Sequence, residues 1–98
     1  MAIIVVMDAP GGTQAQYEQI CNKLTNGRGL VHSPHDWPVA GLRAHVAGPT
    51  GDGWFVADVW DSIEDFHRFA EILAPYLREV GFPDVEPRVL SSFNLVTA

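Results

Sequence analysis

Four short β-prone segments and two helical segments follow one another along this chain in an order that few folds accommodate. Strands are expected at 2–7, 42–47, 54–60 and 88–96, where apolar and β-branched residues run between turn residues. Glycine and proline clusters separate them, most clearly between the second and third strands. The first strand has no polar alternation, so both of its faces are expected to be buried.

The two helical segments are marked by apolar spacing and by residues that start helices. Thr13 and Gln16 have the spacing of a capping box, in which each side chain bonds a free N–H at the helix start. Ser62 is the expected N-cap of a second helix over 63–80. Because Pro75 has no N–H to donate, we expect a kink there, or a break at which a second short helix starts.

The resulting β-α-β-β-α-β order predicts an α+β, ferredoxin-like fold, with a four-stranded antiparallel sheet and both helices on one face. At 98 residues, the whole of 1–98 is expected to be one domain. Hydrophobic residues make up 47% of the chain, more than so short a chain buries alone. We therefore expect a homodimer in which the uncovered sheet faces pack together as an α+β barrel.

Charge and composition exclude several classes of partner. The net charge is −6, and the six Lys and Arg residues are scattered, whereas nucleic acid and anionic membranes require a clustered basic face. The single cysteine, Cys21, allows neither an intrachain disulfide nor a thiolate metal cage. The apolar start of the chain lacks the basic residues and length of a signal peptide, and no run reaches transmembrane length. A cytoplasmic protein is expected.

The hairpin of the second and third strands sorts its side chains by polarity. If the 48–53 turn closes symmetrically, His45 lies opposite Val56 and Arg43 lies opposite Asp58. Directly opposed residues share a sheet face. The polar face then carries Arg43, His45, Trp54, Val56, Asp58 and Trp60, and the apolar face carries Leu42, Ala44, Val46, Phe55, Ala57 and Val59.

This polar face suggests a small-molecule site. His45 is a candidate base and Arg43 a candidate group to hold an anion or enolate. Trp54 and Trp60 would form an apolar wall, with Asp58 also contacting substrate. A structural interpretation remains open, in which Arg43 and Asp58 form a simple cross-strand ion pair and His45 packs at the dimer rim.

Two residues of the second predicted helix are further candidates. His67 borders the apolar stripe and is a candidate catalytic group if it reaches a pocket between helix and sheet. Tyr76 has an amphipathic ring suited to a cavity mouth and is a candidate substrate contact. For both residues the alternative is structural: a half-exposed position for His67 and core packing for Tyr76.

The connection over 27–41 contains His32 and His35, followed by Asp36. Their spacing permits metal ligation, with His45 or His67 as a third ligand. Metal motifs usually add cysteines or a helix-borne histidine pair, and neither is present. We therefore expect no metal, and a connection that crosses the dimer or covers a pocket.

Residues 54–62, WFVADVWDS, followed by Glu64, Phe66 and Phe69, resemble the third strand and second helix of the dimeric α+β barrel superfamily. This superfamily includes antibiotic-biosynthesis-monooxygenase-like and stress-responsive A/B barrel-like proteins. The resemblance implies a dimer, a pocket between sheet and helices, and a cavity-wall position for Trp60. The haem-degrading members pair an asparagine with a histidine, and this chain has neither residue at the corresponding places, so no haem is expected.

The resemblance leaves two classes of function open. The first is a homodimeric pocket protein that acts, without a bound cofactor, as a monooxygenase or cyclase on an apolar, aromatic or polyketide-like molecule. The second is a non-catalytic dimeric binding or interaction module. A cavity of several hundred Å3 would favour the first, and tryptophan side chains filling that space would favour the second.

Overall fold

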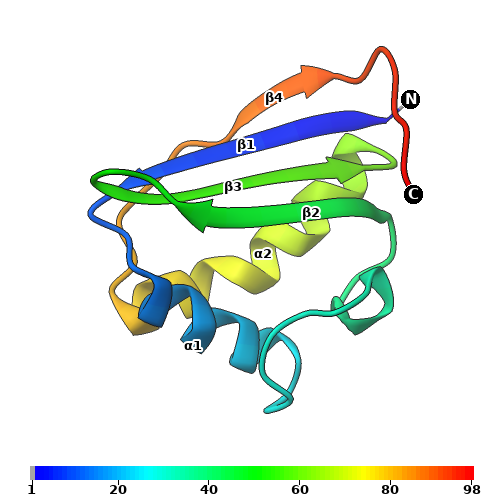
Figure 1. Ribbon diagram of the computed structural model, residues 1–98. Helices are drawn as coiled ribbons and strands as arrows, with labels where there is room; N and C mark the ends of the chain where they lie inside the picture. Colours follow the sequence, from blue (N-terminus) through cyan, green and yellow to red (C-terminus); the bar gives the residue numbers. More distant parts are fainter. Residues whose placement is uncertain (1) are drawn as a thin grey trace.

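A computed structural model describes residues 2–98 and confirms the predicted β-α-β-β-α-β order and ferredoxin-like fold (Figure 1). A single turn of 3-10 helix, η1, lies in the connection between the first helix and the second strand. No helix within 2–98 is long and apolar enough to cross a membrane. The elements are β1 (Ile3–Pro10), α1 (Gln14–Leu24), η1 (Pro34–Asp36), β2 (Leu42–Pro49), β3 (Gly53–Trp60), α2 (Ile63–Val80) and β4 (Arg88–Ser91).

The four strands form one antiparallel sheet in the order β2-β3-β1-β4. Figure 1 shows both helices on the same side of this sheet. We call the sheet face toward the helices the inner face and the opposite one the outer face. In this arrangement β1 and β3 are the central strands, and β2 and β4 lie at the edges.

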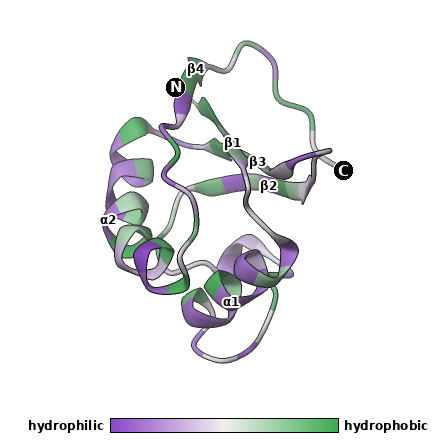
Figure 2. Ribbon diagram, turned by 90° about the vertical axis from the view of Figure 1, so that its left-hand side faces the viewer, coloured by the Kyte–Doolittle hydropathy of each residue, from purple (hydrophilic) through white to green (hydrophobic). Residues whose placement is uncertain are grey.

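The core fills the space between the inner face and the helices. Val5 and Trp60 contribute fully buried side chains from the central strands, and Phe66 and Phe69 meet them from α2. The rings of Trp60 and Phe69 lie 5.2 Å apart. Figure 2 is coloured by hydropathy. It shows that the strands are largely hydrophobic, whereas hydrophobic and hydrophilic residues alternate along the helices.

The predicted helix starts are confirmed, and of the two alternatives expected at Pro75, the break is wrong. Gln16 and Thr13 form both hydrogen bonds of the capping box, each at 3.1 Å. The Ser62 hydroxyl accepts from the Asp65 N–H at 3.2 Å. However, α2 continues as one helix through Pro75, with no second helix starting there. Because Pro75 has no N–H, the backbone carbonyl four residues before it lacks its helical hydrogen bond. Pro75 is exposed, so water can donate to that carbonyl instead.

Two strands differ in length from the prediction. β1 extends to Pro10, because it stays paired with β3 as far as the Pro10–Gly53 register. β4 ends at Ser91, well before the predicted end at 96, because its pairing with β1 ends at Ile3. Beyond β4, Phe93 is fully exposed.

The β2–β3 register also differs from the symmetric hairpin. His45 lies opposite Asp58 instead of Val56, a shift of two residues that keeps both side chains on the inner face. A bulge between Leu42 and Ala44 then contains Arg43 as the extra residue. The bulge turns Leu42 to the inner face and leaves Arg43 exposed, so the predicted opposition of Arg43 and Asp58 is wrong.

Figure 1 shows no element covering the outer face among the described residues. The strand registers make this face almost wholly apolar. Val46 is 61% exposed at its edge. The only charged side chains that the register places on it are Asp8 and Arg88. Its apolar members are Ile4, Val6, Ala44, Val46, Phe55, Ala57, Val59 and Leu90.

Gly53 of β3 lies directly against the backbone of β1, and Gly53→Ala is expected to destabilise the protein. A Cβ there would lie 2.2 Å from the Ala9 carbonyl oxygen and 2.8 Å from Pro10 Cα, and strand backbone cannot move aside cheaply. Overpacking of this kind costs about 1–3 kcal/mol. Urea unfolding at fixed protein concentration measures the change. Gly51→Ala is the control, since its Cβ meets nothing within 4 Å, and equal stability of the two variants would contradict the prediction.

Candidate functional site

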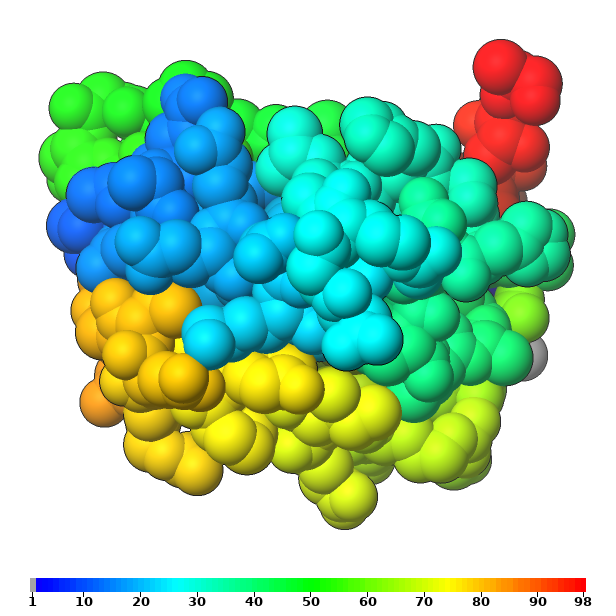
Figure 3. Space-filling model, turned by 90° about the horizontal axis from the view of Figure 1, so that it is seen from below, coloured from blue at the N-terminus to red at the C-terminus, as the bar shows by residue number. Residues whose placement is uncertain are grey.

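A cavity of about 60 Å3 lies between the inner face, α1, α2 and the segment that precedes β4. Most of its lining is aliphatic and aromatic. Figure 3 views the molecule from the helix side, where α1, α2 and the 25–41 connection cover this region. The polar groups that reach it come from Tyr17, His45 and Asp58, together with the Cys21 thiol.

Three of these groups form a hydrogen-bonded chain. Tyr17 Oη lies 2.5 Å from His45 Nε2, and His45 Nδ1 lies 2.6 Å from Asp58 Oδ1. Trp60 donates from its indole N–H to the other carboxylate oxygen, Asp58 Oδ2, at 3.3 Å. The Asp58 side chain is 1% exposed and that of His45 14%. Each member therefore has a fixed partner in a nearly dry environment.

The partners also determine where the protons lie. The Asp58 carboxylate accepts from Trp60, and in the His45 tautomer that donates to it from Nδ1–H, Nε2 is an acceptor. Burial, assisted by the neighbouring Cys21 thiol, raises the pKa of the Tyr17 phenol. Tyr17 is therefore neutral and donates to Nε2. This is the arrangement of a histidine base oriented by a carboxylate.

The sequence brings these groups together through three separate elements. The β2–β3 register places His45 beside Asp58. The capping box fixes the start of α1, and Tyr17 follows it directly, on the face that packs against the sheet. Sequence reasoning missed Tyr17 as a site residue. Its hydroxyl was the available signal, because a buried tyrosine usually has a hydrogen-bond partner.

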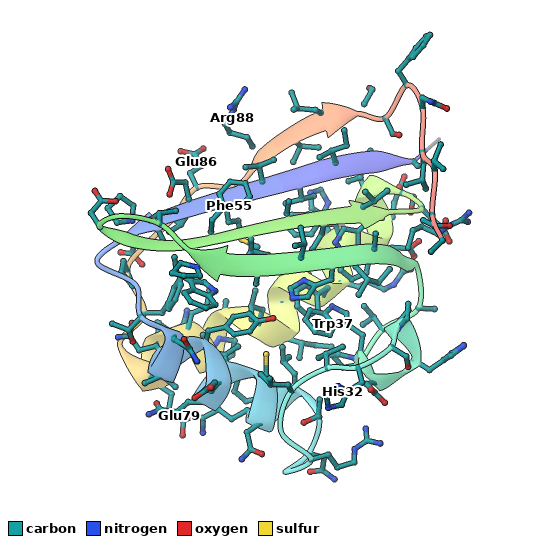
Figure 4. All side chains as sticks on the ribbon, in the orientation of Figure 1. His32, Trp37, Phe55, Glu79, Glu86 and Arg88 are labelled. Atoms are coloured by element: carbon teal, nitrogen blue, oxygen red, sulfur yellow. The ribbon has the colours of Figure 1, made fainter. Side chains whose placement is uncertain are left out.

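Aromatic rings form a continuous row along the cavity. The ring of Trp37 lies 4.9 Å from that of His45. The His45 and Tyr17 rings stack at 6.0 Å and 7°, and Trp54 follows 5.1 Å from Tyr17. Figure 4 shows Trp37 pointing from its connection into the space between sheet and helices. Sequence reasoning missed Trp37, which is 8% exposed.

The predicted site residues divide into two groups. His45, Trp54 and Asp58 line the cavity. Trp60 is fully buried behind Asp58, where its indole supports the carboxylate and packs on α2. In this chain Trp60 therefore orients the site from behind instead of forming the cavity wall.

The other three predicted residues lie away from the cavity. Arg43 pairs with Asp61 at 3.0 Å, with both side chains about half exposed. His67 is exposed on α2. Tyr76 packs against the edge of the core, with Lys23 Nζ 5.9 Å from its ring centre. The structure therefore does not bring Arg43, His67 or Tyr76 to the cavity.

The histidines of the connection do not line the cavity either. His32 and His35 are exposed, and Figure 4 shows His32 beyond Trp37 on the connection. Asp36 accepts from the backbone N–H groups of His32 and Ser33, and these bonds lower the pKa of its carboxyl. Among residues 2–98 no three His, Cys, Asp or Glu side chains are grouped to hold a metal ion.

The thiol of Cys21 also lines the cavity. It is fully buried beside Tyr17, and burial raises its pKa. The thiol is therefore protonated at neutral pH and is not a nucleophile.

The fold is shared with a known class of enzyme. No protein-family model matches the sequence, and no curated protein sequence is significantly similar to it. Solved structures that share the fold confirm the predicted fold. Two crystal structures of SnoaB from Streptomyces nogalater, a cofactor-independent oxygenase, are similar to this chain in fold. Both superpose with a TM-score of 0.60 over 99% of this chain and 97% of SnoaB, at 15% and 14% sequence identity.

Proposed function

We propose that this protein is a cofactor-independent oxygenase of flat aromatic molecules that carry a weakly acidic C–H or O–H group. The observation that carries the proposal is the Tyr17–His45–Asp58 chain at the wall of an otherwise apolar cavity. The fold shared with the oxygenase SnoaB supports it. Arg43 and His67 have no role in this proposal.

The first step is removal of a proton from the substrate. A substrate proton passes to Tyr17 Oη while the Tyr17 proton passes to His45 Nε2, 2.5 Å away. The Asp58 carboxylate stabilises the imidazolium that forms. The apolar lining favours a carbanion whose charge is spread over aromatic rings, and it keeps water away from that carbanion.

The second step is reaction of this carbanion with dioxygen, which is the oxidant. Oxygen accepts electrons from the carbanion, a C–O bond forms, and a hydroperoxide results after the proton returns from His45. Loss of water from the hydroperoxide leaves a ketone. The balance is one CH2 group and one O2 giving one C=O and one water, so the substrate supplies all the electrons.

The free volume limits what can bind without movement. At about 60 Å3 the cavity is well below the several hundred Å3 of usual small-molecule sites. A substrate of two or three rings therefore needs the cavity to widen, and Trp37, which is carried on a connection and not on a helix or strand, is the wall best placed to move.

The same small volume favours a second candidate, a non-catalytic dimeric module whose aromatic residues fill the cavity permanently. In both candidates we propose that the chain forms a homodimer through the outer face. That face is a continuous apolar surface whose two edges are exposed, at Val46 on β2 and at Leu90 on β4. Surfaces of this kind usually mark an interface.

Oxygen consumption with dithranol, a tricyclic dihydroxyanthrone, tests the oxygenase proposal. Its CH2 group is acidic and becomes the carbonyl of a quinone on oxidation. We expect the purified protein to consume one O2 per quinone formed, faster than buffer or denatured protein does. Consumption at the buffer rate would favour the non-catalytic module.

A further inference from the structure

The structure contains a second cavity, of about 260 Å3, which the proposed mechanism does not use. It lies between residues 31–34 of the connection and residues 42–45 at the start of β2. It is open to solvent, because several of its lining residues, Arg43 among them, are exposed. We call the smaller cavity described above the first cavity. His45 lines both cavities, so the two meet at this residue.

Trp37 stands where the two cavities meet. Its ring lies 4.9 Å from that of His45 and 5.0 Å from that of Phe69. It is the only residue of the 25–41 connection that lines the first cavity, and it follows the residues that line the second. The other walls of the first cavity on this side belong to the sheet and to α2. Outward rotation of this one side chain would therefore join the two cavities.

The closed position of Trp37 is not fully satisfied. Its side chain is 8% exposed, and its indole nitrogen is buried without a hydrogen-bond partner within residues 2–98. A buried N–H without an acceptor loses the hydrogen bond that water would give it. Outward rotation restores that hydrogen bond and so offsets part of the lost contact with His45 and Phe69.

The residue before Trp37 holds the connection in its closed shape. Asp36 Oδ2 accepts from the backbone N–H groups of His32 at 3.0 Å and Ser33 at 3.2 Å. The Trp37 N–H donates to the Pro34 carbonyl at 3.2 Å, which completes the turn. The backbone that carries the Trp37 ring is therefore fixed mainly by the Asp36 carboxylate.

We propose that the second cavity is the entrance to the first, that Trp37 is the gate between them, and that Asp36 is the positioning residue that holds this gate closed. The free space on the two sides of the gate together reaches the several hundred Å3 of usual small-molecule sites. The proposal rests on the proposed function only in taking the first cavity as the place where a ligand binds.

Cys21 gives a direct readout of access to the first cavity. It is the single cysteine of the chain, it lines the first cavity, and it has no exposed surface. Methyl methanethiosulfonate, a small thiol reagent, therefore reaches Cys21 only when the cavity opens. The rate of modification, followed by mass spectrometry at fixed pH, measures how often the cavity opens and requires no aromatic ligand.

Asp36→Ala is expected to raise this rate about tenfold, because two backbone N–H groups lose a charged acceptor and the turn loosens. Asp36→Asn keeps an acceptor oxygen without the charge, so its rate should lie between those of the wild type and Asp36→Ala. Glu71→Ala removes a carboxylate at an exposed position of α2 and should leave the rate unchanged. A wild-type rate in Asp36→Ala would overturn the inference.

A second substitution tests the route. Ser33→Phe adds a ring at the second cavity and, combined with Asp36→Ala, should return the rate to the wild-type value or below it. Gln19→Phe adds the same ring at an exposed position of α1 and should have no effect in the same background. An Asp36→Ala rate that Ser33→Phe does not lower would place the entrance elsewhere and contradict the inference.

Unfolding of the whole chain would also expose Cys21, and Gly53→Ala separates the two causes. This substitution is expected to destabilise the protein where β3 meets β1, without touching the connection. It should leave the modification rate nearly unchanged. An increase as large as that of Asp36→Ala would show that modification follows unfolding, and the gate would then be excluded.

The gate and the oxygenase activity fail separately. Modification of Cys21 that responds to Asp36→Ala and Ser33→Phe, without dithranol oxidation, keeps the gate and removes the oxygenase. Dithranol oxidation that depends on His45, with modification indifferent to both variants, keeps the oxygenase and removes the gate.

Discussion

His45→Asn is expected to lower the rate of dithranol oxidation by about 10²–10⁴-fold, the usual contribution of a general base. The asparagine side chain keeps polar contact with Tyr17 and Asp58 and cannot accept the substrate proton at neutral pH. Because His45 is on the inner face, the variant should remain folded. Oxygen uptake at saturating substrate, with circular dichroism for the fold, measures both expectations.

His67→Asn is the matched control for this prediction. It makes the same change at an exposed position of α2, so turnover should be unchanged. Tyr17→Phe removes the hydroxyl next to Nε2 and should slow the reaction as well, by less than the loss of the base itself. Full activity of His45→Asn would show that the base lies elsewhere. Dissociation of the dimer in His45→Ala would place His45 at the interface and contradict the cavity assignment.

Val46→Asp is expected to convert the proposed homodimer into monomers. Val46 is 61% exposed in the single chain, so a carboxylate there costs a monomer little. In a dimer formed through the outer face it would be buried without a partner, at a cost of about 3–5 kcal/mol. Dimer affinity should fall by about 10²-fold or more.

Sedimentation velocity over a range of concentrations measures this effect. Gln19→Asp, at an exposed position of α1 on the opposite side of the sheet, is the control and should leave the dimer unchanged. A Val46→Asp variant that remains dimeric would mean that the chains associate through another surface. A wild type that sediments as a monomer would exclude the barrel.

The sequence predicts the fold well because its signals are local. Capping residues such as Thr13 and Ser62 fix helix starts, and the alternation along β3 sorts its side chains to the two faces. The exact register is less accessible. The bulge at Arg43 contains no glycine or proline from which it could be predicted. Its position is set by the pairing of β2 with β3. That one extra residue separates His45, which reaches the cavity, from Arg43, which does not.

The site is only half predictable for a similar reason. His45 and Asp58 come from one hairpin, whose pairing follows from sequence spacing. Tyr17 and Trp37 come from α1 and a connection, and their approach to His45 depends on how these segments dock on the sheet. The same docking decides the rotation of α2, which leaves His67 exposed although it borders the apolar stripe.

Proton removal without oxygen tests the central claim most directly, because it separates the base from the oxidation that follows. Dithranol is incubated with the protein in deuterated buffer under anaerobic conditions, and exchange of its CH2 protons is followed by NMR. We predict that exchange with the wild type is about 10²-fold faster than in buffer. His45→Asn should lower the exchange rate to that in buffer, and His67→Asn should leave the wild-type rate unchanged. Exchange at the buffer rate with the wild type would contradict the assignment of Tyr17, His45 and Asp58 as a catalytic base.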